Sequence, residues 1–376
     1  MANLLTSGLW YNPYFYAQEG LRVLYKRLGL AFYVKRDLAA GKGSGTGDTV
    51  QVRRAQTFTA VNMPIAVASF ADVNPQYDNL LIGSWMGQGF KLTDKEKTLT
   101  PEVFVRDHLA PVANSIADQI DQNLASLTLE VPWQQLGDAT NPYKDFPNGR
   151  KILLDNKNPI ITPAEYFYMT DSVLQARYET DATFVQAQSD ASAGQLQRDG
   201  QLATKWGFKV FANQNATTFA GGSATGGATV TGVNAAGSAT LTVATLTGTL
   251  KRGSIVSIAG FTQKYAVTVD AVAGTTISIS PKLQVATVGG EAVTYVQTAR
   301  TSLGLAFHRD AMALVMQPLE DAGPGIVSAT VTEPVTGLTL RSRIGGDFGT
   351  GATIWALDAL WGYKTLNPNL MARVWI

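Results

Sequence analysis

Few side chains in this sequence have the type and spacing that catalysis or metal binding requires. The chain of 376 residues holds two histidines, His108 and His308, and neither has a second metal-type ligand four residues away. No Gly-x-Ser-x-Gly motif marks a hydrolase nucleophile. Asp118 and Asp121 lie one helical turn apart, but that spacing is far commoner in solvated or salt-bridged pairs than in catalytic dyads. We therefore expect no enzyme, no catalytic residue and no metal site.

A glycine-rich run, AGKGSGTGD at 40–48, is the segment that most invites a nucleotide-binding interpretation. A phosphate-binding loop needs Lys-Ser or Lys-Thr after its final glycine, and this run has neither. Asp48 also stands where the G-x-G-x-x-G pattern requires its last glycine. The run therefore predicts a loop, and no cofactor is expected.

The composition suits a soluble protein with extensive buried contacts. Charged residues make up 16% of the chain, against roughly 25% in an average soluble protein, and interface cores are depleted in charge. The net charge of +1 provides no strong attraction to nucleic acid or anionic lipid. The absence of cysteine excludes disulfides, thiolate nucleophiles and cysteine metal sites. Neither a signal peptide nor a run of ~20 apolar residues is found.

The first part of the chain predicts helices and a projecting hairpin. A helix is expected over 13–36, because Pro13 suits a first helical position and apolar residues follow at helical spacing. The alternating segment TVQVRR (49–54) predicts a strand, and WMGQGFKLTD (85–94) is expected to return beside it. Together they would form a long hairpin.

The clearest helix is expected over 101–127. Thr100 and Pro101 are typical of a helix start, and Pro111 should bend the helix locally. Its apolar residues recur every third or fourth position, at Val105, Leu109, Val112, Ile116, Ile120, Leu124 and Leu127. One apolar stripe on a rod of about 40 Å predicts a structural strut.

The second part of the chain predicts an α+β region with an all-β insertion. A loop-rich stretch over 132–163 should lead to a helix over 164–178 and a core strand over 208–213. From about residue 216 the composition shifts to Gly, Ala, Ser and Thr, and we interpret 220–298 as an inserted domain with adjacent ends. Its alternating segments predict a small barrel or sandwich: 240–244, 254–259, 265–270, 276–280 and 292–296.

Charge is unevenly distributed along the chain. Residues 35–54 include five basic and two acidic residues, whereas residues 171–199 include five acidic and two basic residues. The basic cluster is too small for tight nucleic-acid binding, which needs many phosphate contacts. We therefore expect Arg53 and Arg54 to contact another subunit, with Asp181 and Asp190 as candidate partners. Lys95 and Lys97 are further candidate interface residues.

Several ordered segments resemble the major capsid (coat) proteins of tailed bacteriophages, in particular the podophage type with an inserted telokin-like domain. GDTVQVRR (47–54) resembles the opening strand of their extended loop. FKLTDKEKTLTPE (90–102) and HLAPVANSIADQID (108–121) resemble the entry to their spine helix and the helix itself. Further similar segments follow in the family's order: 196–215, 250–261, 276–283, 303–320, 337–348 and 355–374. The resemblance covers most of the chain.

The resemblance implies the tailed-phage capsid fold. It would comprise an N-terminal arm (1–36), an extended loop (37–97), a peripheral domain with the spine helix (98–163, closed by a strand near 330–350), an axial domain (164–219 and 299–376) and the inserted β-barrel domain (220–298). It brings no catalytic residue. Some members cross-link a loop lysine to a neighbour's asparagine, for which Lys95 or Lys97 and Asn367 or Asn369 are conceivable.

The resemblance also implies partners and a location. The protein would assemble with itself into pentamers and hexamers of an icosahedral shell, the virion capsid, in the host cytoplasm. Because the chain reaches the arm almost at once, a separate scaffolding protein is expected. A portal protein and non-specifically held double-stranded DNA would be the other partners, and no membrane is involved. Two alternatives stay open: an encapsulin-like shell around a cargo protein, and a β-rich surface or carbohydrate-binding protein.

Overall fold

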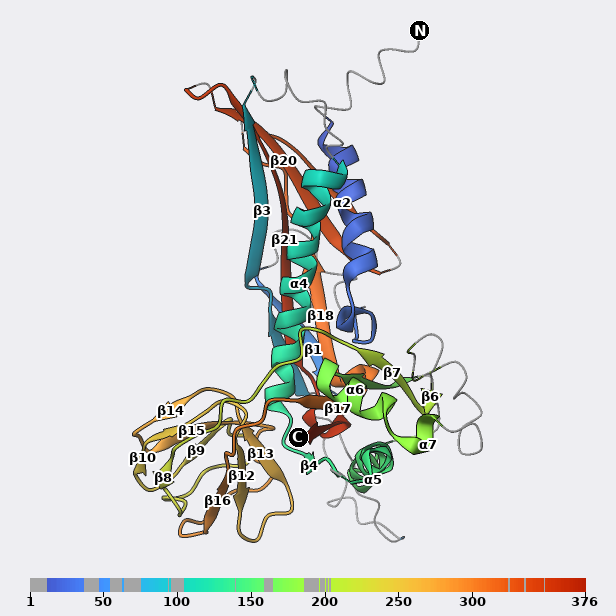
Figure 1. Cartoon of the computed structure of the whole chain (residues 1–376). Coiled ribbons are helices and arrows are strands. Elements are labelled where there is room, and N and C mark those ends of the chain that lie inside the picture. Colours follow the sequence, from blue (N-terminus) through green and yellow to red (C-terminus); the bar gives the residue numbers. More distant parts are fainter. Residues whose placement is uncertain are drawn as a thin grey trace. The chain divides into compact units, whose positions relative to one another are not determined.

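The computed structural model describes residues 12–36, 47–54, 63, 76–93, 95, 105–138, 140–158, 165–185, 196, 200, 202, 204–323, 325–334, 336–347 and 349–376. The chain divides into two units (Figure 1). Unit 1 comprises Met1–Arg27, Arg36–Ile116 and Leu314–Lys364. Unit 2 comprises Leu28–Lys35, Ala117–Ala313 and Thr365–Ile376.

Unit 1 is built on a sheet of long strands. Its strands are hydrogen-bonded in the order β18 (Met312–Gln317), β21 (Ala352–Thr365), β20 (Thr339–Asp347), β19 (Val327–Thr332). A fifth strand, β3 (Ser84–Thr93), also pairs with β21. The register of β3 and β21 runs antiparallel from Thr93 opposite Ala352 to Ser84 opposite Trp361. Alternate residues of every strand therefore point to opposite faces of the sheet.

One face of this sheet is covered by helices. The helix α2 (Pro13–Arg27) packs on β19 and β20, and the unit 1 part of α4 (Ala110–Ser126), which ends at Ile116, lies along the same face (Figure 1). Gly20 of α2 approaches so closely that a Cβ there would lie 2.9 Å from side-chain carbons of Leu340 and Leu357. Several side chains of β21 that point to this face are buried and apolar, among them Trp355, Leu357 and Trp361. This face is the core of unit 1.

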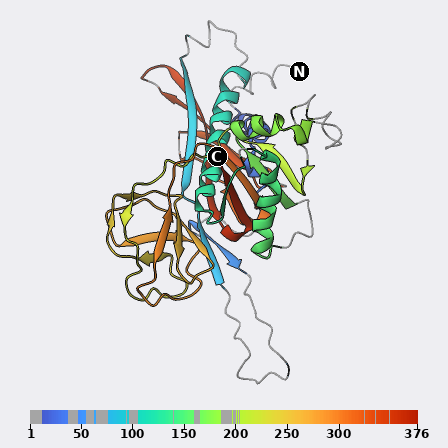
Figure 2. The same cartoon turned by 60° about the horizontal axis from the view of Figure 1, so that its bottom comes forward.

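The hairpin expected from 49–54 and 85–94 is wrong in its second strand. β1 (Thr49–Arg54) pairs with β2 (Gln76–Leu81), whereas 85–94 lies almost entirely in β3 of the long sheet (Figure 2). β2 was not predicted because QYDNLL shows no alternation of apolar and polar residues. β1 and β2 form a two-stranded ribbon, which is marginally stable unless another surface covers it.

The expected N-terminal helix and strut are confirmed in part. α2 begins at Pro13 as predicted but ends at Arg27, and a short 3-10 helix, η2 (Leu30–Phe32), follows Gly29. A π-helical segment, η5 (Val105–Leu109), precedes α4. The irregular segment ends just before Pro111, whose nitrogen has no hydrogen to donate. The expected cap at Thr100 and Pro101 lies outside the described residues.

Unit 2 contains a six-stranded sheet with an aromatic core. Its order is β4 (Gln134–Leu136), β22 (Met371–Trp375), β17 (Leu303–His308), β5 (Tyr166–Thr170), β7 (Phe208–Ala212), β6 (Thr204–Lys205). The helices α5 (Asp145–Asp155), α6 (Ser172–Glu179) and α7 (Ala182–Val185) contribute Phe146, Tyr178 and Phe184 to its core. The predicted strand at 208–213 is confirmed as β7.

The helix expected over 164–178 is wrong in its first half. Residues Tyr166–Thr170 are a completely buried strand, and helix α6 starts only after Asp171, whose carboxylate accepts a hydrogen bond from the backbone N–H of Leu174 at 2.8 Å. The aromatic run YFYMT favours a strand, and Asp171 is a typical N-cap. The loop-rich stretch 132–163 also contains a helix that was not predicted, α5.

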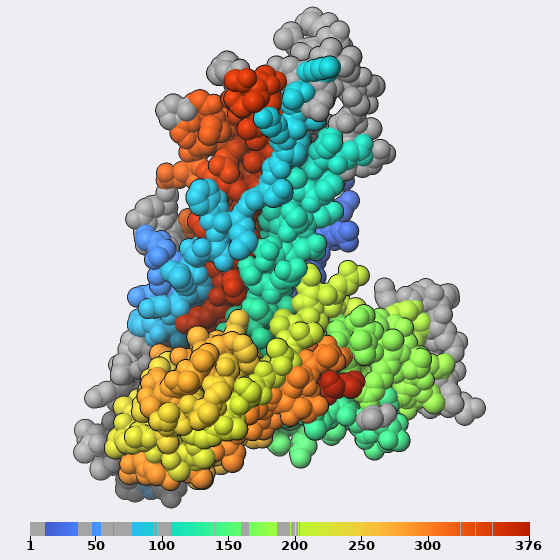
Figure 3. All heavy atoms as spheres, turned by 60° about the vertical axis from the view of Figure 1, so that its left-hand side comes forward, coloured from blue at the N-terminus to red at the C-terminus, as the bar shows by residue number. Residues whose placement is uncertain are grey.

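The region interpreted as an inserted domain, 220–298, contains a sheet and a hydrophobic core cluster of its own. The five predicted strand segments are confirmed as one antiparallel sheet, in the order β16 (Val293–Val296), β12 (Ile255–Ile258), β13 (Lys264–Val267), β15 (Thr276–Ser280), β9 (Thr240–Thr242). Its atoms gather in one lobe (Figure 3, yellow to orange). Two strand pairs complete it: β8 (Thr225–Gly226) with β10 (Leu246–Thr247), and β11 (Thr249–Leu250) with β14 (Ala271–Val272). The insertion's ends lie side by side, because Phe219 and Arg300 exchange two backbone hydrogen bonds of 2.8 Å.

Candidate functional site

The described residues do not form a group of three or more His, Asp or Glu side chains that could hold a metal ion. His108 stacks on Phe90, with ring centroids 5.3 Å apart. His308 is almost buried; its Nδ1 accepts from the backbone N–H of Asp310 at 3.1 Å, and its Nε2 lies 3.2 Å from Glu165 Oε2. Both histidines thus have packing or hydrogen-bond partners of a structural kind.

Asp121 corrects the expectation of a solvated or salt-bridged pair. It is 4% exposed, and its carboxylate accepts hydrogen bonds from the backbone N–H groups of Gly29 at 2.7 Å and Ala31 at 3.3 Å. Burial, partly offset by these bonds, raises the pKa of Asp121 to about 6, and the nearby charge of Asp118 adds to the rise. The carboxylate holds the start of η2 against α4 within unit 2.

The predicted interface residues have different surroundings. Arg53 is exposed on β1, and Lys95 is exposed. Arg54 ends β1, but its side chain lies outside the described part of the structure, as do Lys97 and Asp190. Asp181 accepts hydrogen bonds from the backbone N–H groups of Thr183 at 2.8 Å and Tyr143 at 3.2 Å. Its carboxylate therefore has a structural role at the start of α7, which the acidic composition alone did not indicate.

The β1–β2 ribbon has one buried and one exposed face. Val50 and Leu80, opposite each other in the register, are 8% and 0% exposed. The other face carries Tyr77 and Leu81, which are 51% and 58% exposed, together with Arg53. Large apolar side chains exposed beside a cation on a two-stranded ribbon are typical of a contact surface.

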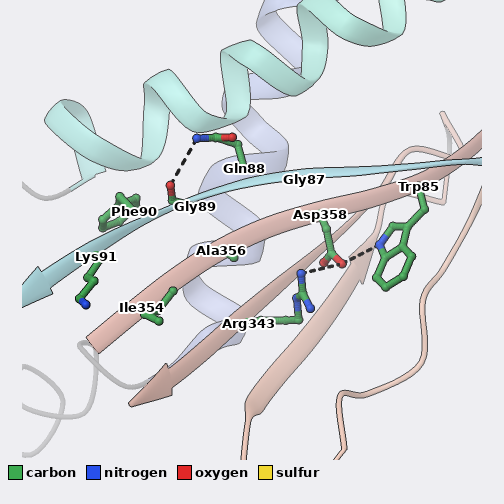
Figure 4. Close-up of a pocket in the computed structure, with 10 residues that line it drawn as sticks. All are labelled: Trp85, Gly87, Gln88, Gly89, Phe90, Lys91, Arg343, Ile354, Ala356 and Asp358. Carbon is green, nitrogen blue, oxygen red and sulfur yellow. Dashed lines mark hydrogen bonds and ion pairs between the residues drawn. The ribbon is translucent and has the colours of Figure 1, made fainter. Parts of the chain in front are cut away.

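The face of the unit 1 sheet opposite the helices carries a groove of about 500 Å³ (Figure 4). Gly87 and Gly89 of β3 and Ala356 of β21 form its floor, and Trp85 and Lys91 stand at its two ends. A Cβ at Gly87 or Gly89 would lie 2.6 Å from Leu357 O or 2.5 Å from Trp355 O, so the close approach of β3 to β21 requires glycine at both. The missing side chains leave the groove open.

A buried carboxylate joins the strands beneath this groove. Asp358 is 1% exposed; it accepts from Arg341 Nε at 3.0 Å and Nη2 at 2.6 Å, and from Trp85 Nε1 at 2.9 Å. The Nη2 of Arg343 lies 3.4 Å from the same Asp358 oxygen, Oδ2 (Figure 4). Two arginines therefore share one carboxylate, so Asp358 alone does not neutralise both guanidinium groups. None of these residues was predicted as a site residue.

The inserted domain is fastened to the rest of unit 2 by two arginines. Arg252 Nη2 donates to Glu130 Oε1 at 3.0 Å and to the carbonyl of Ser126 at 3.3 Å. Arg373 of β22, which is completely buried, donates to the carbonyl of Gly253 at 3.1 Å, and its guanidinium lies over the ring of Trp375. Burial lowers the pKa of Arg373 to about 9.

Both asparagines considered for a cross-link are engaged within the subunit. The Oδ1 of Asn369 accepts from Trp133 Nε1 at 2.9 Å and from Gln263 Nε2 at 3.1 Å. Asn367 Oδ1 accepts from the backbone N–H of Asn369 at 3.1 Å. Asn369, in the 3-10 helix η10 (Pro368–Leu370) before β22, thus contacts Gln263 of the inserted region, and this use of its side chain gives no support to a covalent bond with a neighbour.

Comparison with known proteins identifies the fold. No protein-family model and no curated protein matches the sequence. A solved structure from Mycobacterium phage Che8 is 12% identical, with a TM-score of 0.55, and the match covers 92% of this chain and 90% of that chain. The capsid of cyanophage P-SCSP1u is 10% identical over 88% and 84% of the two chains (TM-score 0.49), and a virus-like particle from Pyrococcus furiosus is 9% identical over 96% and 97% (TM-score 0.43).

At these identities the likeness shows the fold alone. The chain has the α+β fold of tailed-phage capsid proteins, as the sequence resemblance implied. Among the described residues, no helix combines the length and apolar character needed to cross a bilayer.

Proposed function

We propose that this chain is a structural major capsid protein, which assembles with copies of itself into an icosahedral shell around a phage genome. The observation that carries the proposal is the likeness to the Mycobacterium phage Che8 structure over 92% of the chain. The exposed face of the β1–β2 ribbon and the open groove on the unit 1 sheet support it, because both leave apolar side chains for another chain to cover.

The role is one of repeated contact and not of catalysis. Each apolar contact contributes about 25 cal/mol per Å² before ordering costs, so that a single interface stays modest and many together close a shell. We further propose pentamers and hexamers, a separate scaffolding protein, a portal protein and non-specifically held double-stranded DNA as its partners. The location would be the virion capsid, after assembly in the host cytoplasm, and the inserted domain would be of the telokin-like podophage type.

Electron microscopy of the purified full-length protein, alone and with a scaffolding protein from the same genome, tests this function. We expect closed hollow particles of uniform size. Particles purified from infected cells should contain double-stranded DNA, whereas a cargo protein inside would favour the encapsulin-like alternative. A protein that stays monomeric at high concentration under both conditions would contradict the proposal.

A further inference from the structure

The open face of the unit 1 sheet carries an acidic segment as well as the basic groove. Residues 319–322 cross this face above β19, since the carbonyls of Leu319 and Glu320 accept from Thr330 Oγ1 at 2.7 Å and from Arg341 Nη1 at 2.6 Å. The backbone N–H of Ala322 donates to Ser328 Oγ at 2.8 Å. These bonds fix the segment's backbone. The side chain of Asp321 is exposed, and its Oδ1 accepts from Ser328 Oγ at 3.3 Å.

The arginine side chains at the groove have more hydrogen-bond donors than the nearby carboxylate can accept. Arg341 and Asp358 neutralise each other through two short hydrogen bonds. Arg343 reaches the same carboxylate only at 3.4 Å, and its buried Nε has no hydrogen-bond partner. Lys91, at the end of the groove, is 47% exposed and lies 3.9 Å from Asp347. An additional carboxylate at the groove would therefore find a guanidinium ready to pair.

Apolar side chains flank both halves. Trp85 and Ile354 at the groove are 59% and 42% exposed, and Ile326, which follows the acidic segment, is 43% exposed. Exposed apolar groups around a few charges are the usual composition of a protein interface. The groove and the acidic segment lie on one face of one sheet, so this face is complementary to itself.

We propose that two copies of the chain pair through this face about a two-fold axis, with Asp321 of each copy at the Arg343 groove of the other. A two-fold interface requires one patch to carry both halves of each contact, which this patch does. The inference rests on the proposed self-assembly and specifies one of its contacts. The occupant of the groove is thus the acidic segment of a second copy.

Mixed single-cysteine variants test the pairing directly, because the natural chain contains no cysteine. The Cα atoms of an arginine and an aspartate in contact are farther apart than those of two cysteines in a disulfide. A short bis-maleimide is therefore the suitable cross-linking reagent. Full-length Asp321→Cys and Arg343→Cys chains are mixed before assembly and then treated. We expect a linked dimer in the mixture and none from either variant alone. Arg309→Cys, exposed in unit 2, mixed with Asp321→Cys is the matched control and should give none.

Charge reversal provides a second, independent measurement. Arg343→Glu alone and Asp321→Arg alone should each raise the protein concentration needed for assembly by about tenfold or more, because like charges then face each other. In a mixture of the two variants both contacts regain opposite charges, and assembly should return toward the natural level. Shells that form normally without linked dimers and without this rescue would overturn the pairing but leave the capsid function standing. A natural chain that never associates would overturn both.

Discussion

Asp358 in unit 1 and Asp121 in unit 2 are both almost completely buried, and the chain compensates their charges differently. Asp358 is surrounded by two arginines and an indole N–H. Asp121 is bonded to backbone N–H groups, with the like charge of Asp118 nearby. A buried charge needs an opposite charge or several hydrogen bonds, and dipoles alone leave more of the desolvation cost unbalanced. The difference predicts that removal of Asp358 costs most and that Asp121 responds most to pH.

The largest effect is expected from Asp358→Ala. The substitution would leave Arg341, which is 7% exposed, and Arg343 without a carboxylate. Breaking a buried ion pair from one side costs about 3–5 kcal/mol. Urea unfolding of the unassembled subunit measures the loss, with the exposed Asp155→Ala as a control that should change stability by about 0.5 kcal/mol or less. A loss below about 1 kcal/mol for Asp358→Ala would show that the arginines find other partners.

A smaller effect is expected from Asp121→Ala. It removes the acceptor of the Gly29 and Ala31 N–H groups, and each buried unsatisfied donor costs about 1–3 kcal/mol unless water reaches it. Asp121→Asn keeps one acceptor oxygen and should cost less. The same unfolding measurement ranks the three variants. An Asn variant as damaging as the Ala variant would mean that the charge itself, and not the acceptor, holds η2.

The smallest effect is a shift with pH. The pKa of Asp121 is about 6 in the folded chain, above the ordinary aspartate value of 3.8, so the folded chain binds this proton more tightly. The stability contributed by protonation is present below about pH 4 and is lost as the pH rises to about 6. Relative to Asp121→Asn, the natural chain should therefore gain about 1 kcal/mol between about pH 7 and pH 5. Unfolding curves at both pH values measure this, and an unchanged difference between the two chains would exclude Asp121 as the titrating group.

The sequence predicted those parts of the fold whose signals are local. The strands of the inserted domain, such as TISIS at 276–280, alternate clearly between glycine-rich turns, and Pro13 marks the start of α2. The prediction for Tyr166–Thr170 was wrong because a short aromatic run fits a helix and a strand equally well, unless Asp171 is recognised as the N-cap of the helix that follows. Local pattern is sufficient where the period is unambiguous.

The surface contacts were not predictable in the same way. Asp358 meets Trp85 across 273 residues, and Asp121 meets Gly29 across 92, so only the strand register and the packing bring them together. The groove itself results from absent side chains at Gly87 and Gly89, which in a sequence weaken a strand prediction and do not indicate a site. The exposure of Arg53 could be expected from its place on a short charged strand, and its contact with another subunit stays a prediction.

The paired backbone hydrogen bonds of Phe219 and Arg300 have a consequence for how such a chain is modified. Where a module leaves and re-enters its host at neighbouring positions, it can be removed, exchanged or enlarged without rethreading the host. A short turn joining these two residues would connect β7 directly with β17, and a foreign β domain could be inserted at the same place. The guanidinium of Arg373 donates to the carbonyl of Gly253 in the inserted region. A replacement domain would have to provide an acceptor for this buried arginine, or Arg373 would have to be replaced.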